Sequence, residues 1–151
     1  MANNYTLMSV ELRGLTEEEI AWFKRQTDVE ALERLVNDFA GGGERDGSCV
    51  FFDCFYEGAA WLGFCIDIQG DRAVIYHDES ADLENVALLL QSYLRKFHPE
   101  KSIGFKWAYI CDKPRPDEFG GGACVVSAEG CEWMTTDQWM DQALRQEGKV
   151  D

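Results

Sequence analysis

The sequence at residues 61–77 is WLGFCIDIQGDRAVIYH, and this stretch decides the fold. Two runs rich in β-branched and aromatic residues, 61–68 and 73–77, flank the turn signal Gln69-Gly70-Asp71. Such a pattern is typical of an antiparallel hairpin. Apolar residues alternate along the first run, so we expect one side of the hairpin to face a core.

A helix and a long strand are predicted after this hairpin. Apolar residues recur at helical spacing over residues 83–97, and Ser80 or Asp82 can cap the start of that helix. Large apolar residues then alternate strictly over residues 103–111, which predicts a strand with one buried face.

A second hairpin is predicted near the end of the chain. A polar, proline-bearing loop is expected at residues 112–119, and Gly120-Gly121-Gly122 follows it. Strands are expected at residues 123–127 and 131–133, on either side of the turn Glu129-Gly130.

A terminal helix should follow the second hairpin. Thr135 and Gln138 have the spacing of a capping box, so we expect a helix from there to about Gln146. Residues 147–151 are expected to be frayed. The apolar side chains that we expect to face inward are Trp139, Met140, Ala143 and Leu144.

The N-terminal part of the chain predicts a strand and two helices. The strand is expected at residues 5–12. Two capping boxes, one at Thr16 and Glu19 and one at Thr27 and Glu30, predict the helix starts. These boxes indicate that the first helix is short and that the second follows it almost at once.

The second helix is expected to end at Gly41-Gly42-Gly43, and an aromatic run at residues 49–56 is expected to form a strand. Two successive hairpins with helices before, between and after them predict an α+β fold, with about four helices packed on a mainly antiparallel sheet. A doubly wound parallel fold would alternate strand and helix strictly. We expect one domain over residues 1–151.

The charge of the chain limits its partners. It has 28 Asp and Glu against 14 Lys and Arg, a net charge of −14, yet 46% of its residues are hydrophobic and 13% aromatic. The composition supports a packed core rather than a disordered acidic tail. Because such a surface repels phosphate and acidic lipid, we expect no direct nucleic-acid or membrane binding. A basic protein partner is expected, the alternative being that the charge serves only solubility.

Localisation and cofactors are predicted from what the sequence lacks. Residues 1–7 show no secretory signal, and no window approaches the ~18 apolar residues of a membrane span, so we expect a cytoplasmic protein. The six cysteines form no C-x-x-C pair and are interpreted as buried thiols. Neither histidine has ligand spacing to a cysteine, so no metal and no cofactor are predicted.

Two acidic runs are the candidate partner-binding residues. One lies at the start of the first helix and the other before and within the start of the 83–97 helix. Acids at helix starts also stabilise the helix dipole, so a purely structural role is the simpler interpretation of each. The candidates are Glu17, Glu18, Asp78, Glu79, Asp82 and Glu84.

A loop with two cations and three glycines supports a different hypothesis. Lys113 and Arg115 precede Gly120, Gly121 and Gly122, and glycine amides with nearby cations can hold an anion. The P-loop and dinucleotide fingerprints do not fit, because no G-K-[ST] follows and the glycines lead into a strand. The alternative function is therefore an enzyme or binding domain for an anionic small molecule.

The same region carries a resemblance to a family. The run W-A-x-x-C-x-K-P-R-x-x-x-F-G-G-G at residues 107–122, with E-W-M-T-T-x-x-W at residues 132–139, resembles small uncharacterised proteins of phages and other mobile elements. The resemblance covers about the last third of the chain. It implies an accessory role, such as inhibition of a DNA-handling protein or mimicry of nucleic acid, and gives no catalytic residue.

The sequence supports a catalytic function less strongly than a binding function. His77 with the nearby carboxylates, or Cys111 with His98, would each supply a single base without a family signature. We therefore leave enzymatic activity open and favour a non-enzymatic protein. A structural homo-oligomer is a third hypothesis, with the adjacent Trp22 and Phe23 as the place to look for an exposed apolar face.

Overall fold

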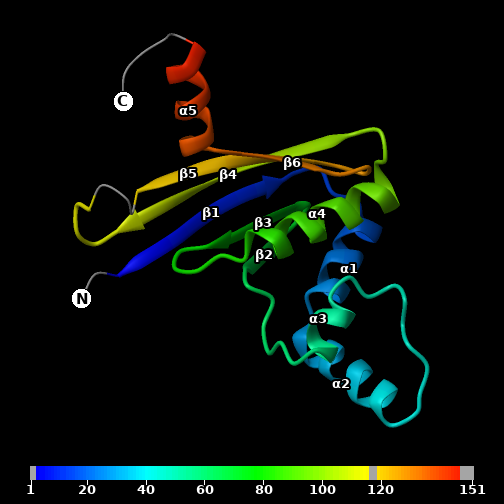
Figure 1. The fold of residues 1–151 in the computed structure, drawn as a ribbon. Helices are drawn as coiled ribbons and strands as arrows, with labels where there is room; N and C mark the ends of the chain where they lie inside the picture. The colour runs from blue at the N-terminus through cyan, green and yellow to red at the C-terminus, as the bar shows by residue number, and fades with distance from the viewer. Residues whose placement is uncertain (1–2, 116–118, 147–151) are drawn as a thin grey trace.

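The computed structural model describes residues 3–115 and 119–146. Its described strands are β1 (Asn4–Leu12), β2 (Cys65–Gln69), β3 (Arg72–His77), β4 (Ser102–Cys111), β5 (Gly120–Ser127) and β6 (Cys131–Thr135). They form one antiparallel sheet in the order β2-β3-β1-β4-β5-β6 (Figure 1). The helices are α1 (Glu17–Gln26), α2 (Val29–Ala40), α3 (Phe52–Tyr56), α4 (Leu83–Phe97) and α5 (Thr136–Gln146). The α+β class and the two predicted hairpins are confirmed.

One face of the sheet forms the main core, and α4 covers it. Register places Ile75 beside Val10 and Phe105 beside Cys124, and all four side chains are buried. The apolar stripe of α4, including the fully buried Leu90, packs in the same cluster. The alternation predicted for residues 103–111 is therefore confirmed.

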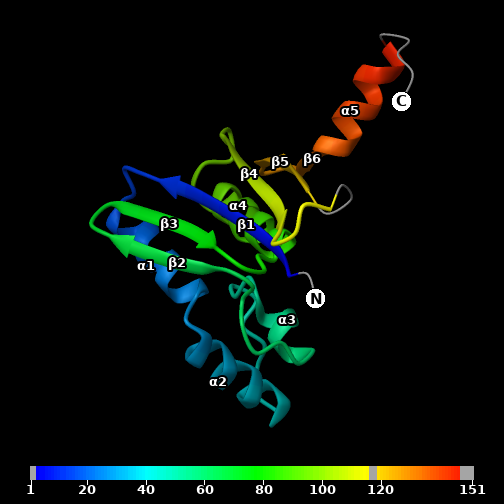
Figure 2. The same cartoon turned by 90° about the vertical axis from the view of Figure 1, so that its left-hand side faces the viewer.

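The opposite face of the sheet has no helix lying across it (Figure 2). Every second side chain along each strand points to this face, and several of these side chains are large and exposed. Tyr76, Ile110, Val125 and Met134 belong to this set, and Lys106 lies among them on β4. We call this surface the open sheet face.

Helix α1 is attached to α4 through a buried carboxylate. The predicted capping box is confirmed: the Glu19 amide donates to Thr16 Oγ1, and the Thr16 amide donates to Glu19 Oε1, each at 3.1 Å. Glu19 Oε2 also accepts the Tyr93 hydroxyl and lies 3.0 Å from His98 Nε2. Burial works to raise the pKa of the Glu19 carboxyl, but these hydrogen bonds outweigh it and leave that pKa below its usual value.

The expected strand at residues 49–56 is wrong. The chain forms the short helix α3 there, preceded by a turn. Phe51, Phe52 and Phe55 are the buried residues, and their separations of three and four are helical rather than alternating. Aromatic content suggested a strand, but the spacing of the buried rings decides for a helix.

The start of one helix and the start of one strand also differ from the expectation. Asp28, not Thr27, caps α2 by accepting the Ala31 amide at 3.1 Å. Thr27 instead donates its hydroxyl to the Phe23 carbonyl and closes α1. The first strand of the central hairpin was expected to start at Trp61, but β2 begins only at Cys65.

The prediction that the apolar side chains of helix α5 face inward is wrong for Trp139 and Met140. The capping box of this helix is confirmed, with Thr135 and Gln138 exchanging hydrogen bonds of 2.8 and 3.1 Å. The helix projects away from the body (Figures 1 and 2), with its main contacts at β5 and β6. Trp139 is 61% exposed and Met140 48% exposed, so neither faces a core in this chain.

The expected exposed pair on the first helix is also corrected, because Trp22 and Phe23 are both buried against α4. The predicted frayed segment 147–151 lies outside the described residues. Within 3–115 and 119–146, the helices all lack the length and apolar composition needed to cross a membrane.

Candidate functional site

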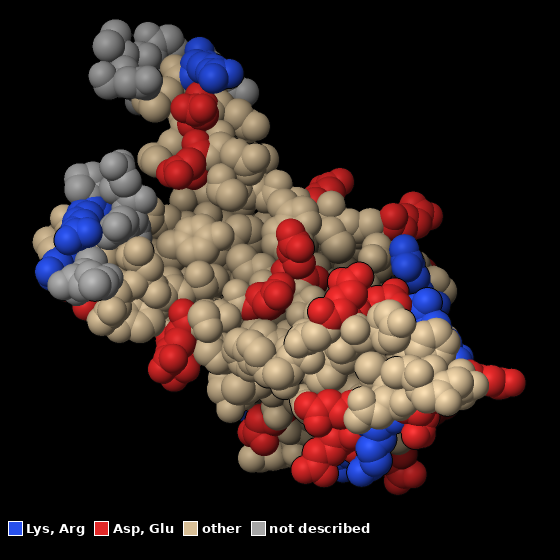
Figure 3. Space-filling view, turned by 60° about the horizontal axis from the view of Figure 1, so that its bottom comes forward, with Lys and Arg blue, Asp and Glu red and all other residues tan. Residues whose placement is uncertain are grey.

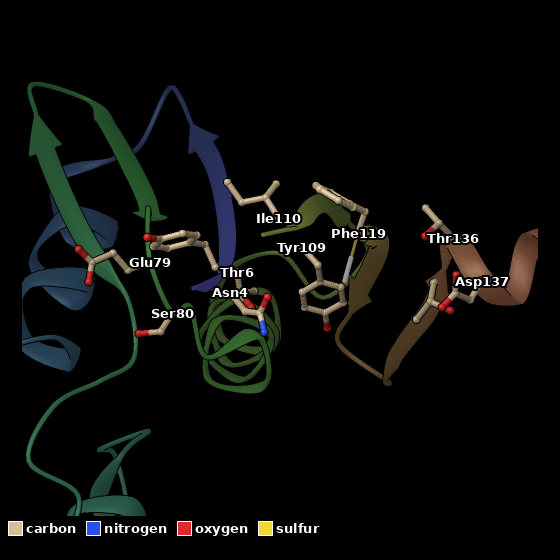
Figure 4. A pocket seen from close by; sticks show the side chains of 13 residues that line it. Asn4, Thr6, Glu79, Ser80, Tyr109, Ile110, Phe119, Thr136 and Asp137 are labelled. Carbon is tan, nitrogen blue, oxygen red and sulfur yellow. The ribbon is translucent and has the colours of Figure 1, made fainter. Parts of the chain in front are cut away.

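A groove of about 450 Å³ lies at the end of the sheet where β1, β4 and β5 meet the loop before α4 and the first turn of α5. We call it the acidic groove. Figure 4 shows Glu79 and Ser80 on one side, Thr136 and Asp137 on the other, and Tyr109 and Phe119 between them. Its lining residues are Asn4 to Thr6, Glu79, Ser80, Tyr109, Ile110, Phe119 to Gly121 and Thr135 to Asp137.

The Glu79 side of the groove is fixed by backbone hydrogen bonds. The Thr6 amide donates to the Glu79 carbonyl at 2.8 Å, and the Ala81 amide donates to the Thr6 carbonyl at 3.2 Å. His77 Nδ1 accepts the amides of Glu79 and Ser80 at 3.0 and 2.9 Å. The loop is therefore attached to β1 and to the imidazole, which fixes the backbone of Glu79, while the Glu79 side chain is exposed.

The Asp137 side is fixed by the start of α5. The capping box at Thr135 and Gln138 sets the first turn, and Asp137 is exposed within it. Gly120 brings this turn close to the sheet: a Cβ on Gly120 would lie 3.3 Å from Thr136 Oγ1 and 3.8 Å from the Tyr109 ring. A larger residue at position 120 would therefore push Thr136 away by a few tenths of an ångström.

The middle of the groove is aromatic. Tyr109 is 41% exposed and Phe119 is 46% exposed, and Ile110 lies beside them. Exposed rings flanked by carboxylates suit an organic cation, because a ring face attracts positive charge by about 0.5–1 kcal/mol at exposed sites. A guanidinium or ammonium group can contact the rings and a carboxylate at the same time.

The described lining of the groove is negative. Among the described residues it has two carboxylates and no Lys or Arg, and Lys113 and Arg115 lie on the segment that precedes Phe119. Residues 46–94, which lead up to and include the Glu79 loop, contain nine Asp and Glu and a single base, Arg72. An anionic ligand would meet repulsion here, and a cation would be attracted.

The carboxylates on the face shown in Figure 3 are dispersed. On the face shown in Figure 3 they spread across the middle and lower part, with Lys and Arg mainly at the margins. This face shows no single row of carboxylates, so it does not support the nucleic-acid-mimic form of the prediction.

The structure separates the predicted acidic residues. Asp78, Glu79, Asp82 and Glu84 lie together around the start of α4, but among them only Glu79 lines the groove. Asp82 caps α4 by accepting the Asn85 amide at 3.0 Å, a structural role. Glu17 and Glu18 are exposed in the first turn of α1 and are not brought to the groove.

The predicted anion site is not assembled as expected. Gly120, Gly121 and Gly122 belong to β5 and pair with β4 rather than forming an open loop. Lys113 and Arg115 are exposed and do not line the groove.

The glycines have a packing reason instead. A Cβ on Gly122 would lie 2.4 Å from the Met134 carbonyl oxygen and 2.6 Å from the Trp107 ring. A Cβ on Gly121 would lie 2.4 Å from the Trp107 carbonyl oxygen. Any larger residue would therefore push β5 away from its neighbours.

The described cysteines form no disulfide with one another. Burial, with Cys131 nearby, raises the pKa of the Cys124 thiol to about 12, and burial also raises that of Cys49. Both thiols are therefore protonated and unreactive at neutral pH. Among the described residues, no group of three or more His, Cys, Asp or Glu is placed to hold a metal ion.

Most of the groove was not predicted from the sequence. Tyr109 lies on the strand face that was expected to be buried, and Asp137 was not a candidate. Three of the five tryptophans, Trp61, Trp133 and Trp139, are exposed, and of these Trp139 was expected to face inward. No local pattern brings residues 79, 109, 119 and 137 together, because the sheet order does so.

Comparison of the chain with protein-family models, with curated proteins and with solved structures gave no match.

Proposed function

We propose that this protein is a binding protein that docks a positively charged segment of a protein partner in the acidic groove. A Lys or Arg side chain of the partner would lie between Glu79 and Asp137, over Tyr109 and Phe119. The observation that carries the proposal is the lining itself, which among the described residues has two carboxylates and exposed aromatic rings but no Lys or Arg.

The physical support comes from preorganisation. Glu79 and Asp137 lie on segments whose backbone is fixed by hydrogen bonds and a capping box, so little backbone entropy is lost when a cation binds. The net charge of −14 adds attraction at longer range, which speeds encounter with a basic partner. We expect a fast, salt-sensitive interaction.

The resemblance to phage and mobile-element proteins extends this proposal to the kind of partner. A basic, nucleic-acid-binding protein presents Lys and Arg on the surface that contacts phosphate. An acidic chain that binds this surface would compete with the nucleic acid. This extension rests on the resemblance and on the charge, whereas the groove alone specifies only a cationic side chain.

The test uses a defined probe. A 12-residue peptide containing four Arg residues spaced by Gly and Ser is titrated into the protein by isothermal calorimetry at low salt. The double variant Glu79→Gln/Asp137→Asn is compared with Glu17→Gln/Glu18→Gln, which removes the same charge from α1. We expect the groove variant to weaken binding by about tenfold or more and the α1 variant by about twofold.

Equal effects of the two double variants would show that the peptide responds to overall charge and would reject the groove. Inorganic phosphate provides the arm for the alternative function. If phosphate binds and its affinity falls in Lys113→Gln/Arg115→Gln, the anion hypothesis replaces the proposal.

A further inference from the structure

A second cavity lies between the C-terminal half of α1, the end of α4 and the loop at residues 47–50. Its volume is about 410 Å³. Three of the side chains that line it are cations, Arg25, Arg95 and Lys96. Among the residues that the structure describes, this lining contains no Asp or Glu. We call this cavity the basic pocket.

The lining of the basic pocket differs from the composition of the chain. Acids outnumber bases by 28 to 14 over the whole sequence. Bases in the last turn of a helix stabilise the helix dipole, and all three cations stand in such turns. Stabilising each helix separately, however, does not require the ends of two helices to share one cavity. The convergence of the three cations therefore calls for a reason beyond the helix dipole.

The loop side of the basic pocket is held by a buried amide. Gln26 is fully buried, and its Nε2 donates to the Ser48 carbonyl while its Oε1 accepts the Val50 amide, each at 2.8 Å. Arg25 Nη2 donates to Asp46 Oδ2 at 2.9 Å and also to Ser48 Oγ. The loop is thereby attached to α1 at several points, so the cavity exists before a ligand enters it.

Two of the three cations keep their charge available. Asp46 neutralises part of the charge of Arg25, whereas Arg95 and Lys96 form no ion pair within the described residues. Arg95 Nε donates to the Ala128 carbonyl at 2.7 Å, and its two terminal nitrogens have no acceptor in the described part of the chain. A guanidinium can bind two oxygens of one anion, and an ammonium adds a compact positive charge.

The basic pocket also contains a hydroxyl without a partner. Ser92 lines the cavity from α4 and is half-buried, and its hydroxyl makes no hydrogen bond to any described residue. A ligand oxygen that accepts this hydroxyl would complete its hydrogen bonding.

We propose that the basic pocket binds the phosphate group of a small organic phosphate monoester. Arg95 and Lys96 hold the phosphate oxygens, and the Ser92 hydroxyl donates to one of them. A phosphate monoester has a charge of about −1.5 to −2 and three acceptor oxygens, which matches two cations without a carboxylate partner and one hydroxyl.

The size and the apolar part of the basic pocket indicate an organic group on the phosphate. Pockets for small organic ligands have volumes of about 300–1,000 Å³, and this cavity lies within that range. Trp22 and Val50 line it, and the Trp22 ring is held by Tyr93 and Phe97, whose ring centroids lie 6.1 and 6.0 Å away. An aromatic group on the phosphate can contact the part of the indole that lines the cavity.

This site is separate from the acidic groove. The two cavities share no lining residue and have opposite charge in their described linings. The inference therefore goes beyond the proposed function and does not depend on it.

The test is a calorimetric titration of the full chain with phenyl phosphate and with inorganic phosphate at low salt. Arg95→Gln/Lys96→Gln removes the two available cations, and Arg72→Gln/Lys106→Gln removes the same charge from the open sheet face. Circular dichroism and thermal melting check that each variant folds. We expect phenyl phosphate to bind the parent chain about fivefold more tightly than inorganic phosphate. Its affinity should fall at least tenfold in the pocket variant and less than about twofold in the control.

A further variant separates an enclosed pocket from a charged surface. Ser92→Leu keeps every charge but removes the hydroxyl and fills part of the cavity, so we expect it to weaken phenyl phosphate binding by about fivefold or more. Absence of binding to the parent chain up to about 5 mM, equal losses in the two double variants, or unchanged affinity in Ser92→Leu would overturn the inference. Loss of binding in Lys113→Gln/Arg115→Gln alone would also overturn it, because the anion would then bind at the loop before Phe119.

Discussion

Val125 and Val126 are neighbours on the same strand, yet one is 48% exposed and the other fully buried. Each belongs to one face of the six-stranded sheet. The face with Val126 is covered by α4 and forms the core, and the face with Val125 has no cover within the chain. The comparison shows that alternation tells which residues share a face, whereas the packing of helices decides which face becomes the core.

The two faces should also differ in what they do. The covered face stabilises the fold, whereas the open sheet face leaves Val125 and its apolar neighbours exposed to solvent. The acidic groove lies at the end of the sheet and differs from both, because its exposed rings are flanked by carboxylates. We therefore expect substitutions in the covered face to change the stability of the fold and substitutions in the acidic groove to change binding.

The largest effect on stability is expected from Glu19→Ala, on the covered side. The substitution leaves the buried Tyr93 hydroxyl and His98 Nε2 without their shared acceptor. It also removes the side-chain acceptor of the Thr16 amide, which is one half of the capping box. We expect the free energy of unfolding in urea to fall by about 3 kcal/mol. Glu17→Ala, an exposed neighbour in the same helix turn, is the control and should change it by less than about 0.5 kcal/mol.

The next effect compares the two valines directly. Val126→Ala opens a space in the core and should cost about 2 kcal/mol of unfolding free energy, while Val125→Ala should cost less than about 0.5 kcal/mol. Chemical denaturation of dilute, monomeric protein measures both. Similar costs at the two positions would show that the open sheet face is buried in solution even in the monomer.

The pH dependence of the stability tests the role of Glu19. Its pKa is lowered from 4.5 on folding, so its ionised form stabilises the fold above about pH 4.5, and this contribution is lost as the pH falls through the lower, folded pKa. We expect the parent chain to lose stability below about pH 4.5 more steeply than Glu19→Gln. Parallel curves for the two proteins between pH 5 and 2.5 would contradict this assignment.

A smaller effect is expected in the groove. Phe119→Ala removes an exposed ring, so the affinity for the Arg peptide should fall by about threefold to tenfold while the melting temperature stays unchanged. Tyr56→Ala is the control, because it removes an exposed ring outside the groove. Loss of affinity in both variants would indicate binding by scattered aromatic residues.

Much of the fold was predictable, because it depends on patterns within single elements. The capping boxes at Thr16 and Thr135, the helix at residues 83–97 and the strand at residues 103–111 follow local rules. The prediction of a strand at residues 49–56 was wrong because aromatic residues occur in both strands and helices. Only the spacing of the buried rings distinguishes the two. The predicted packing of α5 was wrong because amphipathic spacing does not tell whether the apolar side of a helix contacts its own chain.

The groove was less predictable than the fold. Glu79 was a candidate, but its meaning depends on Tyr109, Phe119 and Asp137, which come from elements distant in sequence. The order of strands brings β1 between β3 and β4 and so joins the Glu79 loop to the start of α5 across the sheet end. The glycines suggested an anion site, and their actual reason is close packing against Trp107.

The most direct test of the proposed function is a titration of ¹⁵N-labelled protein with the Arg peptide, followed through backbone amide signals. We expect the signals of Glu79, Gly120 and Asp137 to shift together and saturably, while those of Glu17 and Glu18 on α1 stay within the noise. Shifts centred on α1, or spread evenly over all acidic residues, would contradict a cation-binding groove.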